Sequence, residues 1–240
     1  MSVAESTYPE PSLEVICRNG ALTHDAPLPA PRAAHALQGV FLNRRSIRRL
    51  QDGPFTPEMR HRVLEAVRLT PAAYNLPPWR VVLVHERREE TWGQIEAAFR
   101  DHLGGERLER NLGRLAGFRP GVALALIYED LRVGRVLRAE KGASDELATQ
   151  FVQQALGMVQ LSLWLALTAE GLSSSLQHWE EFLADRTERL TGLPAADFQL
   201  AAAMPFGYAA EEPRDIERPT TDQVCAVDPD ASRLARPEVV

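Results

Sequence analysis

Cysteine and lysine are scarce in this sequence of 240 residues. Its two cysteines, Cys17 and Cys225, lie near opposite ends, and neither has a C-x-x-C partner or histidines at ligand spacing. The pattern therefore predicts neither a disulfide framework nor a zinc site. The sequence also has no G-x-G-x-x-G after a strand, no P-loop and no convincing Ser-His-Asp order. Because no basic region followed by an apolar run stands at the N-terminus, we expect a cytoplasmic protein.

Charge is missing altogether from residues 147–169. The segment is long enough to span a bilayer. Its four glutamines, at positions 150, 153, 154 and 160, would be costly in hydrocarbon, so we expect no membrane span. A helix with so little polar face is expected to be buried in protein. We predict that it lies at the interface of an obligate homodimer; the alternative is a central helix within a monomer.

The rest of the chain has an ordinary globular composition, with 45% hydrophobic and 25% charged residues. Its pattern predicts an extended Pro/Ala-rich arm over residues 1–35, a folded domain over 36–222 and a tail over 223–240. Helices are expected over residues 36–45, 56–69, 88–102, 105–116, 144–170 and 180–190, and strands over 80–86, 122–128 and 198–204. This non-alternating order predicts an α+β fold in which helices flank one central mixed sheet.

Arginine is the abundant basic residue, supplying 26 of 27 basic side chains, and it is concentrated in residues 43–50. There, four arginines and Ser46 lie within seven residues of a chain whose net charge is −6. Such a local cluster favours a small bound anion, since a nucleic-acid surface needs a broader basic field. Guanidinium groups and a hydroxyl are suitable donors for a phosphate. The alternative is a solvated face that follows from the arginine-rich composition.

Three further motifs follow the basic segment: Pro71 to Trp79 (PAAYNLPPW), Gly171 to Trp179 (GLSSSLQHW) and Met204 to Gly207 (MPFG). Their order and spacing over about residues 38–220 resemble the FMN-dependent nitroreductase family. Within that family the sequence is most similar to the subgroup called fatty-acid repression mutant proteins. The resemblance implies a nitroreductase-like fold with the long uncharged helix at a dimer interface.

The resemblance also implies which residues hold FMN. Arg44, Ser46 and Arg48 match positions that bind the phosphate and reach toward the ring, with Arg45 between them. A basic residue of the tail completes the phosphate site in the family; Arg218 fits that place best, and Arg214 is the alternative.

Two other segments are implied to contact the flavin ring. Pro71, Ala72, Ala73 and Asn75 match a turn that lies against the flavin of the neighbouring subunit. Gln177 and His178 match a loop whose backbone amides face the ring. Arg114 would place a cation near the flavin pyrimidine, against the alternative of a solvated helix face. Because alanines replace the family's serines at 72 and 73, we expect an apolar acceptor slot.

By resemblance, the chain would be a homodimeric NAD(P)H oxidoreductase that reduces nitroaromatic, quinone or similar electrophilic acceptors by a ping-pong hydride mechanism. The chemistry would be flavin-centred, with NADH or NADPH as reductant and without a metal or a required side-chain catalyst. A flavin-dependent dehydrogenase or dehalogenase on the same fold is one alternative. A non-catalytic flavin-binding regulator that responds to redox state or lipid is another.

Overall fold

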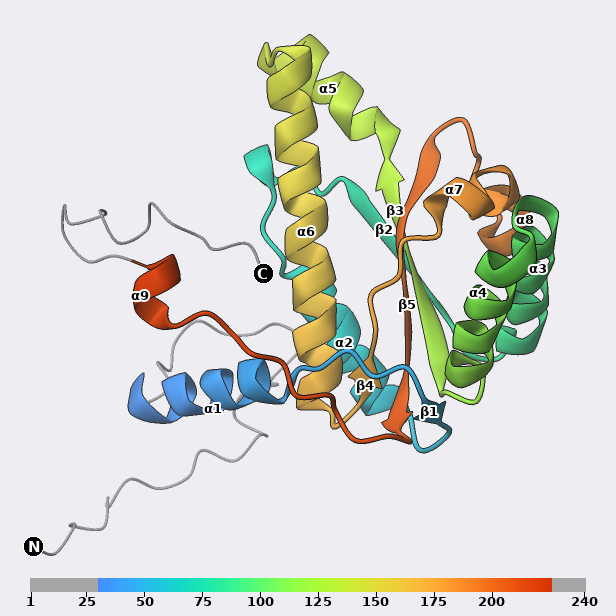
Figure 1. Cartoon of the computed structure of the whole chain (residues 1–240). Coiled ribbons are helices and arrows are strands. Elements are labelled where there is room, and N and C mark those ends of the chain that lie inside the picture. The colour runs from blue at the N-terminus through green and yellow to red at the C-terminus, as the bar shows by residue number, and fades with distance from the viewer. Residues whose placement is uncertain (1–29, 226–240) are drawn as a thin grey trace, which may run out of the picture. The chain divides into compact units, whose positions relative to one another are not determined.

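The computed structural model describes residues 30–225, which form two compact units that divide after Arg44 (Figure 1). The described part of the first unit is mainly one helix, α1 (Ala30–Asn43). Of the arm predicted over residues 1–35, positions 1–29 lie outside the described residues, and 30–35 belong to α1. The second unit begins at Arg45 and contains the sheet and the remaining helices.

The second unit is built on a five-stranded sheet with the order β1-β5-β3-β2, in which β4 also pairs with β5. The strands are β1 (Leu50–Gln51), β2 (Trp79–Val84), β3 (Ala123–Asp130), β4 (Ser173–Ser174) and β5 (Phe198–Ala209). Among the described residues every ladder is antiparallel, and the parallel element is a single bridge between Ser46 and Ser174.

The helices of this unit begin where the sequence offers suitable caps. Thr56 accepts a hydrogen bond from the backbone N–H of Met59, and Ser144 accepts one from Leu147. The helices are α2 (Pro57–Arg68), α3 (Arg88–His102), α4 (Gly105–Phe118), α5 (Leu131–Lys141), α6 (Asp145–Ala169), α7 (Glu180–Leu183), α8 (Thr187–Thr191) and α9 (Thr221–Val224). Two 3-10 turns, η2 (Ala73–Asn75) and η3 (Ala184–Arg186), complete the described elements.

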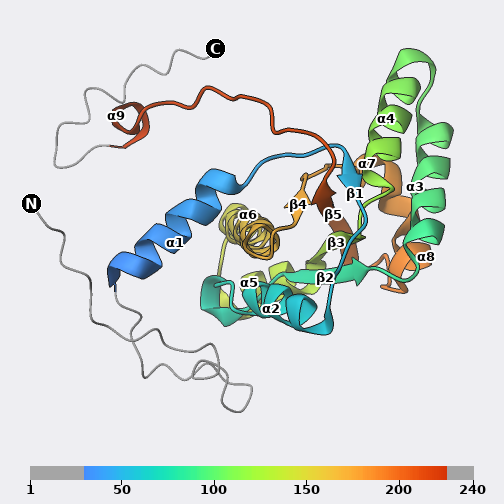
Figure 2. The same ribbon diagram turned by 90° about the horizontal axis from the view of Figure 1, so that it is seen from below.

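Helices cover both faces of the sheet. Helices α2, α5 and α6 lie on one face, and α3, α4, α7 and α8 lie on the other (Figure 1 and Figure 2). Strand β3 divides its side chains between two cores: Leu124, Leu126 and Tyr128 pack with the second group of helices. Ala125 and Ile127 pack against α2 and α6. Both faces of β3 are therefore buried, which explains its unbroken apolar run.

Helix α6 buries one face and exposes the other. Seven of its side chains are buried: Ala148, Val152, Ala155, Leu156, Val159, Leu163 and Leu167. By length and composition α6 could span a membrane, but the core helix of a soluble protein passes the same test. On the opposite face Leu147, Met158 and Leu161 remain 39–41% exposed in the single chain. That a second subunit covers this face of α6 remains a prediction.

The predicted α+β fold with a helix-flanked central sheet is confirmed, and most element bounds agree within two residues. Three predictions of extent were wrong. The helix expected over 36–45 already begins at Ala30, and the strand expected to end at Met204 continues to Ala209. The helix expected over 180–190 is divided into α7, η3 and α8. The helix α5 was missed, as were the two-residue strands β1 and β4.

Candidate functional site

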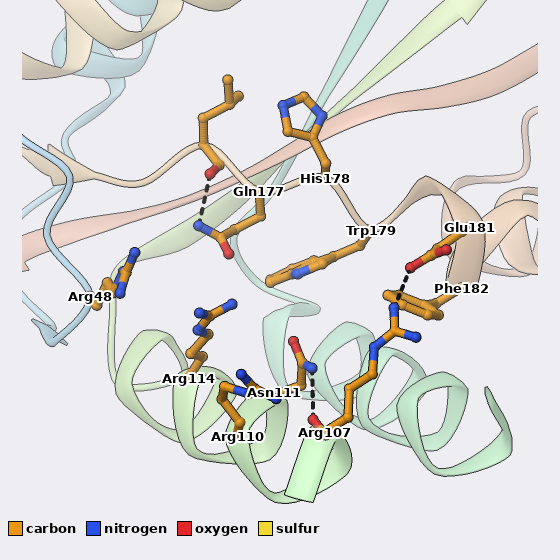
Figure 3. Close-up of a pocket in the computed structure, with 11 residues that line it drawn as sticks. Arg48, Arg107, Arg110, Asn111, Arg114, Gln177, His178, Trp179, Glu181 and Phe182 are labelled. Atoms are coloured by element: carbon orange, nitrogen blue, oxygen red, sulfur yellow. Dashed lines mark hydrogen bonds and ion pairs between the residues drawn. The ribbon is translucent and has the colours of Figure 1, made fainter. Parts of the chain in front are cut away.

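A pocket of about 470 Å³ lies between helix α4 and the segment that joins β4 to α7 (Figure 3). Four of its lining residues are arginines, and one is a carboxylate, Glu181. The lining residues are Arg48, Arg107, Arg110, Asn111, Arg114, Leu176, Gln177, His178, Trp179, Glu181 and Phe182. They come from three segments far apart in the sequence, so the fold itself assembles the pocket.

Arg48 is placed by an extended segment that is fixed on both sides. The backbone N–H of Ile47 donates to the carbonyl of Ser174 at 3.1 Å. The carboxylate of Glu211 accepts hydrogen bonds from the backbone N–H groups of Arg48 and Arg49, at 2.6 and 3.1 Å. Ile47 is buried, whereas Ser46 and Arg48 are exposed, since alternate side chains of an extended chain point to opposite sides.

Helix α4 forms the opposite wall, and its packing follows from its sequence. Leu115 and Phe118 are buried, and Leu108 and Leu112 pack against the same core. The arginines at positions 107, 110 and 114 lie three and four residues apart, so they share one side of the helix. We call these three residues the α4 arginine row.

Gly117 sets the closest approach between α4 and the Arg48 segment. A Cβ atom at this position would lie 2.3 Å from the carbonyl oxygen of Arg48. That distance is far below van der Waals contact, and the opposing atom is backbone rather than a flexible side-chain end. Glycine at position 117 therefore lets the helix that bears the arginine row pack directly on the segment that bears Arg48.

The third part of the site is the segment from Leu176 to Trp179. Gln177 forms a bridge with Ala203 of β5, in which each backbone N–H donates to the other carbonyl at 2.8 Å. The side-chain amide of Gln177 donates to Ser175 Oγ and to the carbonyl of Leu176. Because the N–H of Gln177 is already used, the His178 N–H is the better candidate of the two for a ligand; among the described residues it has no partner.

Two aromatic and ionic contacts shape the end of the pocket near α7. Trp179 is only 4% exposed and packs edge-on to Phe99, with ring centroids 5.6 Å apart. It is thus a core residue that also borders the pocket. His178 is exposed and has Glu180 Oε1 3.7 Å from its Nδ1.

The structure brings together four of the residues that the sequence suggested, namely Arg48, Arg114, Gln177 and His178. Arg45 lies nearby in sequence, and its guanidinium donates to the carbonyl of Arg214 at 3.4 Å, which brings the tail to the basic segment. Arg218 is exposed on that tail. Arg44 belongs to the first compact unit.

The turn at residues 71–75 is not part of this pocket. Tyr74 and Asn75 have positive φ angles of 54° and 55°, and the Tyr74 ring packs edge-on against Phe151 of α6. Since α6 is the helix with the uncovered face, the turn lies beside the surface expected to meet a second subunit. Its proposed contact with a neighbouring flavin remains a prediction.

Sequence reasoning missed Arg107, Arg110 and Glu181. The signal was present, because arginines at positions 107, 110 and 114 have the spacing of one helix side. It was obscured by an arginine-rich composition in which many such rows are solvated. The wall that α4 forms is cationic. The apolar slot expected from Ala72 and Ala73 remains a prediction, because these residues do not line this pocket.

The donors of this pocket are suitable for a planar anionic cofactor. Within residues 30–225, the guanidinium groups of Arg48, Arg110 and Arg114 have no hydrogen-bonding or ionic partner. Arginine remains charged at all relevant pH values, so these groups are available to phosphate oxygens or to ring carbonyl oxygens. The pocket is therefore a candidate binding site for an anionic ligand.

Comparison with known proteins identifies the family. The Nitroreductase family model matches residues 42–208, and the chain belongs to this family. An NADH dehydrogenase of Thermus thermophilus is 27% identical over 184 residues, which are 71% of this chain and 85% of that protein. The candidate nitroreductase HBN1 of Saccharomyces cerevisiae is 26% identical over 118 residues, covering 49% of this chain and only 58% of HBN1.

Solved structures share the fold at lower identity. The nitroreductase CinD from Lactococcus lactis, in complex with nicotinic acid, has a TM-score of 0.70 at 22% identity and covers 81% of this chain and 98% of its own. The FMN-dependent nitroreductase NfnB from Mycobacterium smegmatis, in complex with NADPH, has a TM-score of 0.64 at 16% identity, covering 81% and 99%.

Proposed function

We propose that this chain is a homodimeric, FMN-dependent NAD(P)H oxidoreductase that reduces nitroaromatic, quinone or similar electrophilic acceptors. The observation that carries the proposal is the convergence of Arg48, Arg114, Gln177 and His178 on one pocket. The family resemblance selected these residues from the sequence alone. Their gathering from three distant segments would be a coincidence if they shared no ligand.

At the phosphate end, Arg44, Ser46 and Arg48 would hold FMN, with Arg45 connecting them to the tail. The hydrogen bond from Arg45 to the Arg214 carbonyl supports a role for the tail in closing this end. Either Arg214 or Arg218 would supply the additional cation.

At the ring end, the His178 N–H and the neighbouring Gln177 would face the flavin, and Arg114 would lie near its pyrimidine. The turn formed by Pro71, Ala72, Ala73 and Asn75 would contact the flavin of the partner subunit. Bound FMN would supply the two-electron chemistry, accepting a hydride from NAD(P)H and passing two electrons to the acceptor. The chain itself would position both substrates in turn over one pocket, which is the requirement for a ping-pong order.

The relatives support the coarse assignment. NfnB is described as FMN-dependent and was solved with NADPH, and the Thermus relative is named as an NADH dehydrogenase. CinD was solved with nicotinic acid, a small aromatic ligand. Membership of the fatty-acid repression mutant subgroup, and a cytoplasmic location, remain part of the proposal.

The direct test is the absorption spectrum of the purified protein, in which oxidised flavin gives two characteristic bands. We expect Arg48→Ala and Arg44→Ala each to weaken FMN binding by about 2 kcal/mol, or roughly 30-fold, because each removes a charge-assisted contact. Arg189→Ala is the control, since Arg189 is exposed and does not line the pocket. A flavin-free protein, or NADH oxidation that acceptors do not accelerate, would contradict the function.

The dimer is tested on the uncovered face of α6. Leu161 is 41% exposed in the single chain, so Leu161→Glu should leave the fold intact but prevent association. Leu163 is fully buried, and Leu163→Glu would therefore unfold the chain without testing assembly. Leu64→Glu on α2, where Leu64 is 39% exposed, is the matched control. We expect light scattering to detect a dimer for the native protein and a flavin-poor monomer for Leu161→Glu; a flavin-loaded native monomer would overturn the assembly.

A further inference from the structure

The α4 arginine row extends beyond the residues assigned to the flavin. Arg107 and Arg114 are seven residues apart, so the row spans about 10 Å of pocket wall at ~1.5 Å per helical residue. The proposed function uses Arg114 and Arg48. It leaves Arg110 and Arg107, toward the N-terminus of α4, without a role, although both line the same pocket.

The two unassigned arginines differ in their contacts. Arg107 donates to Glu181 at 3.0 Å and lies over the ring of Phe182, 5.6 Å from its centroid (Figure 3). These contacts hold its guanidinium at the edge of the pocket. Arg110 has no hydrogen-bonding or ionic partner among residues 30–225. One carboxylate therefore faces four arginines, and the pocket retains an excess of positive charge.

Unpaired arginines that converge on one cavity repel each other, and they gain stabilisation when an anion enters. Several arginines outside the pocket do have carboxylate partners, such as Arg62 with Glu170 and Arg119 with Glu89. Convergence distinguishes the pocket, because four arginines line one cavity with a single carboxylate, Glu181.

We propose that Arg110, assisted by Arg107, forms an anion subsite for the ligand that binds beside the flavin. Its occupant is a carboxylate, sulfonate or phosphate group carried either by an aromatic acceptor or by the pyridine dinucleotide. The proposal rests on the proposed function in naming these two sources. It predicts a preference for anionic ligands at this pocket, which Ala72 and Ala73 do not line.

Isothermal calorimetry on the purified protein tests the subsite without turnover. The probes are 4-nitrobenzoate and its neutral analogue 4-nitrobenzamide, together with ADP-ribose. ADP-ribose is the anionic part of the dinucleotide and lacks the hydride-donating nicotinamide. Arg110→Ala should weaken binding of an anionic probe about tenfold, leave 4-nitrobenzamide unchanged, and Arg110→Lys should restore part of the loss. Arg189→Ala should change none of the three affinities.

The outcomes distinguish the acceptor from the dinucleotide as the source of the anionic group, and failure of the subsite from failure of the proposed function. A loss confined to 4-nitrobenzoate assigns the subsite to the acceptor, and a loss confined to ADP-ribose assigns it to the dinucleotide. Equal losses for the charged and neutral nitroarenes, or no loss for any probe, would overturn the subsite. If the absorption spectrum shows flavin while the calorimetry shows no effect of Arg110→Ala, only the subsite fails. If flavin is absent, the proposed function fails whatever the calorimetry gives.

Discussion

Two groups of arginines in this chain differ in what surrounds them. At the end of β3, Arg80 and Arg132 share the buried carboxylate of Asp130, each with a contact of 2.8 Å. At the pocket, Arg110 and Arg114 have no such partner in the described part of the chain. The first group completes its interactions within the fold and stabilises it. The second group leaves its donors available, which is the property that a ligand site needs.

Loss of the ion pairs that Arg80 and Arg132 form with Asp130 should produce the largest change in the free energy of unfolding. Asp130 is 2% exposed, accepts hydrogen bonds from the Arg132 side chain and contacts Arg80, and caps α5 through the backbone N–H of Arg132. Asp130→Ala should lower the free energy of unfolding by about 3 kcal/mol, because the charge-assisted bonds and the cap are lost together. Urea denaturation measures this change. Glu90→Ala, in the exposed pair with Arg87, should change the stability far less.

The same carboxylate makes part of the stability dependent on acid. Burial disfavours the charged form of Asp130, but hydrogen bonds from Arg132 and the charges of Arg80 and Arg132 outweigh it, so its pKa lies below the ordinary value. A lowered folded-state pKa contributes stability above the unfolded-state pKa of about 3.9, and this is lost as pH falls through the folded-state value. As the pH falls below about 4, the difference in the free energy of unfolding between the native protein and Asp130→Ala should therefore narrow. A difference that stays unchanged would contradict the linkage.

The geometry of the unpaired group can be changed without altering its charge. Gly117→Ala would place a methyl group against the Arg48 carbonyl oxygen, so α4 must move away from the Arg48 segment. We expect a loss of about 2 kcal/mol in stability together with weaker flavin binding. Gly113→Ala is the matched control, because nothing lies within 4 Å of a Cβ there. It should stabilise the helix by up to about 1 kcal/mol and leave flavin binding unchanged.

The contrast also explains how far the sequence alone could be interpreted. The helices at 88–102 and 105–118 and the apolar strand at 123–130 follow from local periodicity, and their existence was predictable. The C-terminal end of the strand expected over residues 198–204 was not predictable. Pro205 and Gly207 indicate a break, yet β5 continues to Ala209 because β1, β3 and β4 all pair with it there. Tertiary pairing overrode the local signal.

Some residues of the candidate site were likewise predictable from the sequence, and others were not. Arg48, Gln177 and His178 were found because they belong to motifs that are contiguous in the sequence. Arg110 was not found, because the helical spacing that it shares with Arg107 and Arg114 does not separate an unpaired row from paired arginines such as Arg119 or Arg100. The difference is the absence of a nearby carboxylate, which only the folded chain reveals.

The smallest predicted effect is the one that separates the two groups most directly. In the absence of ligand, Arg110→Ala should not reduce stability and should raise the free energy of unfolding by a few tenths of a kcal/mol, because it relieves repulsion within the arginine row. Arg132→Ala should instead lower it, since it leaves the buried Asp130 with fewer donors. Both effects should shrink at high salt, because about half of each Asp130-bound arginine is exposed and the row is open to solvent. Paired measurements of urea denaturation at low and high ionic strength check the signs. If Arg110→Ala costs as much stability as Arg132→Ala, Arg110 has a structural partner after all, and its availability to an anionic ligand is refuted.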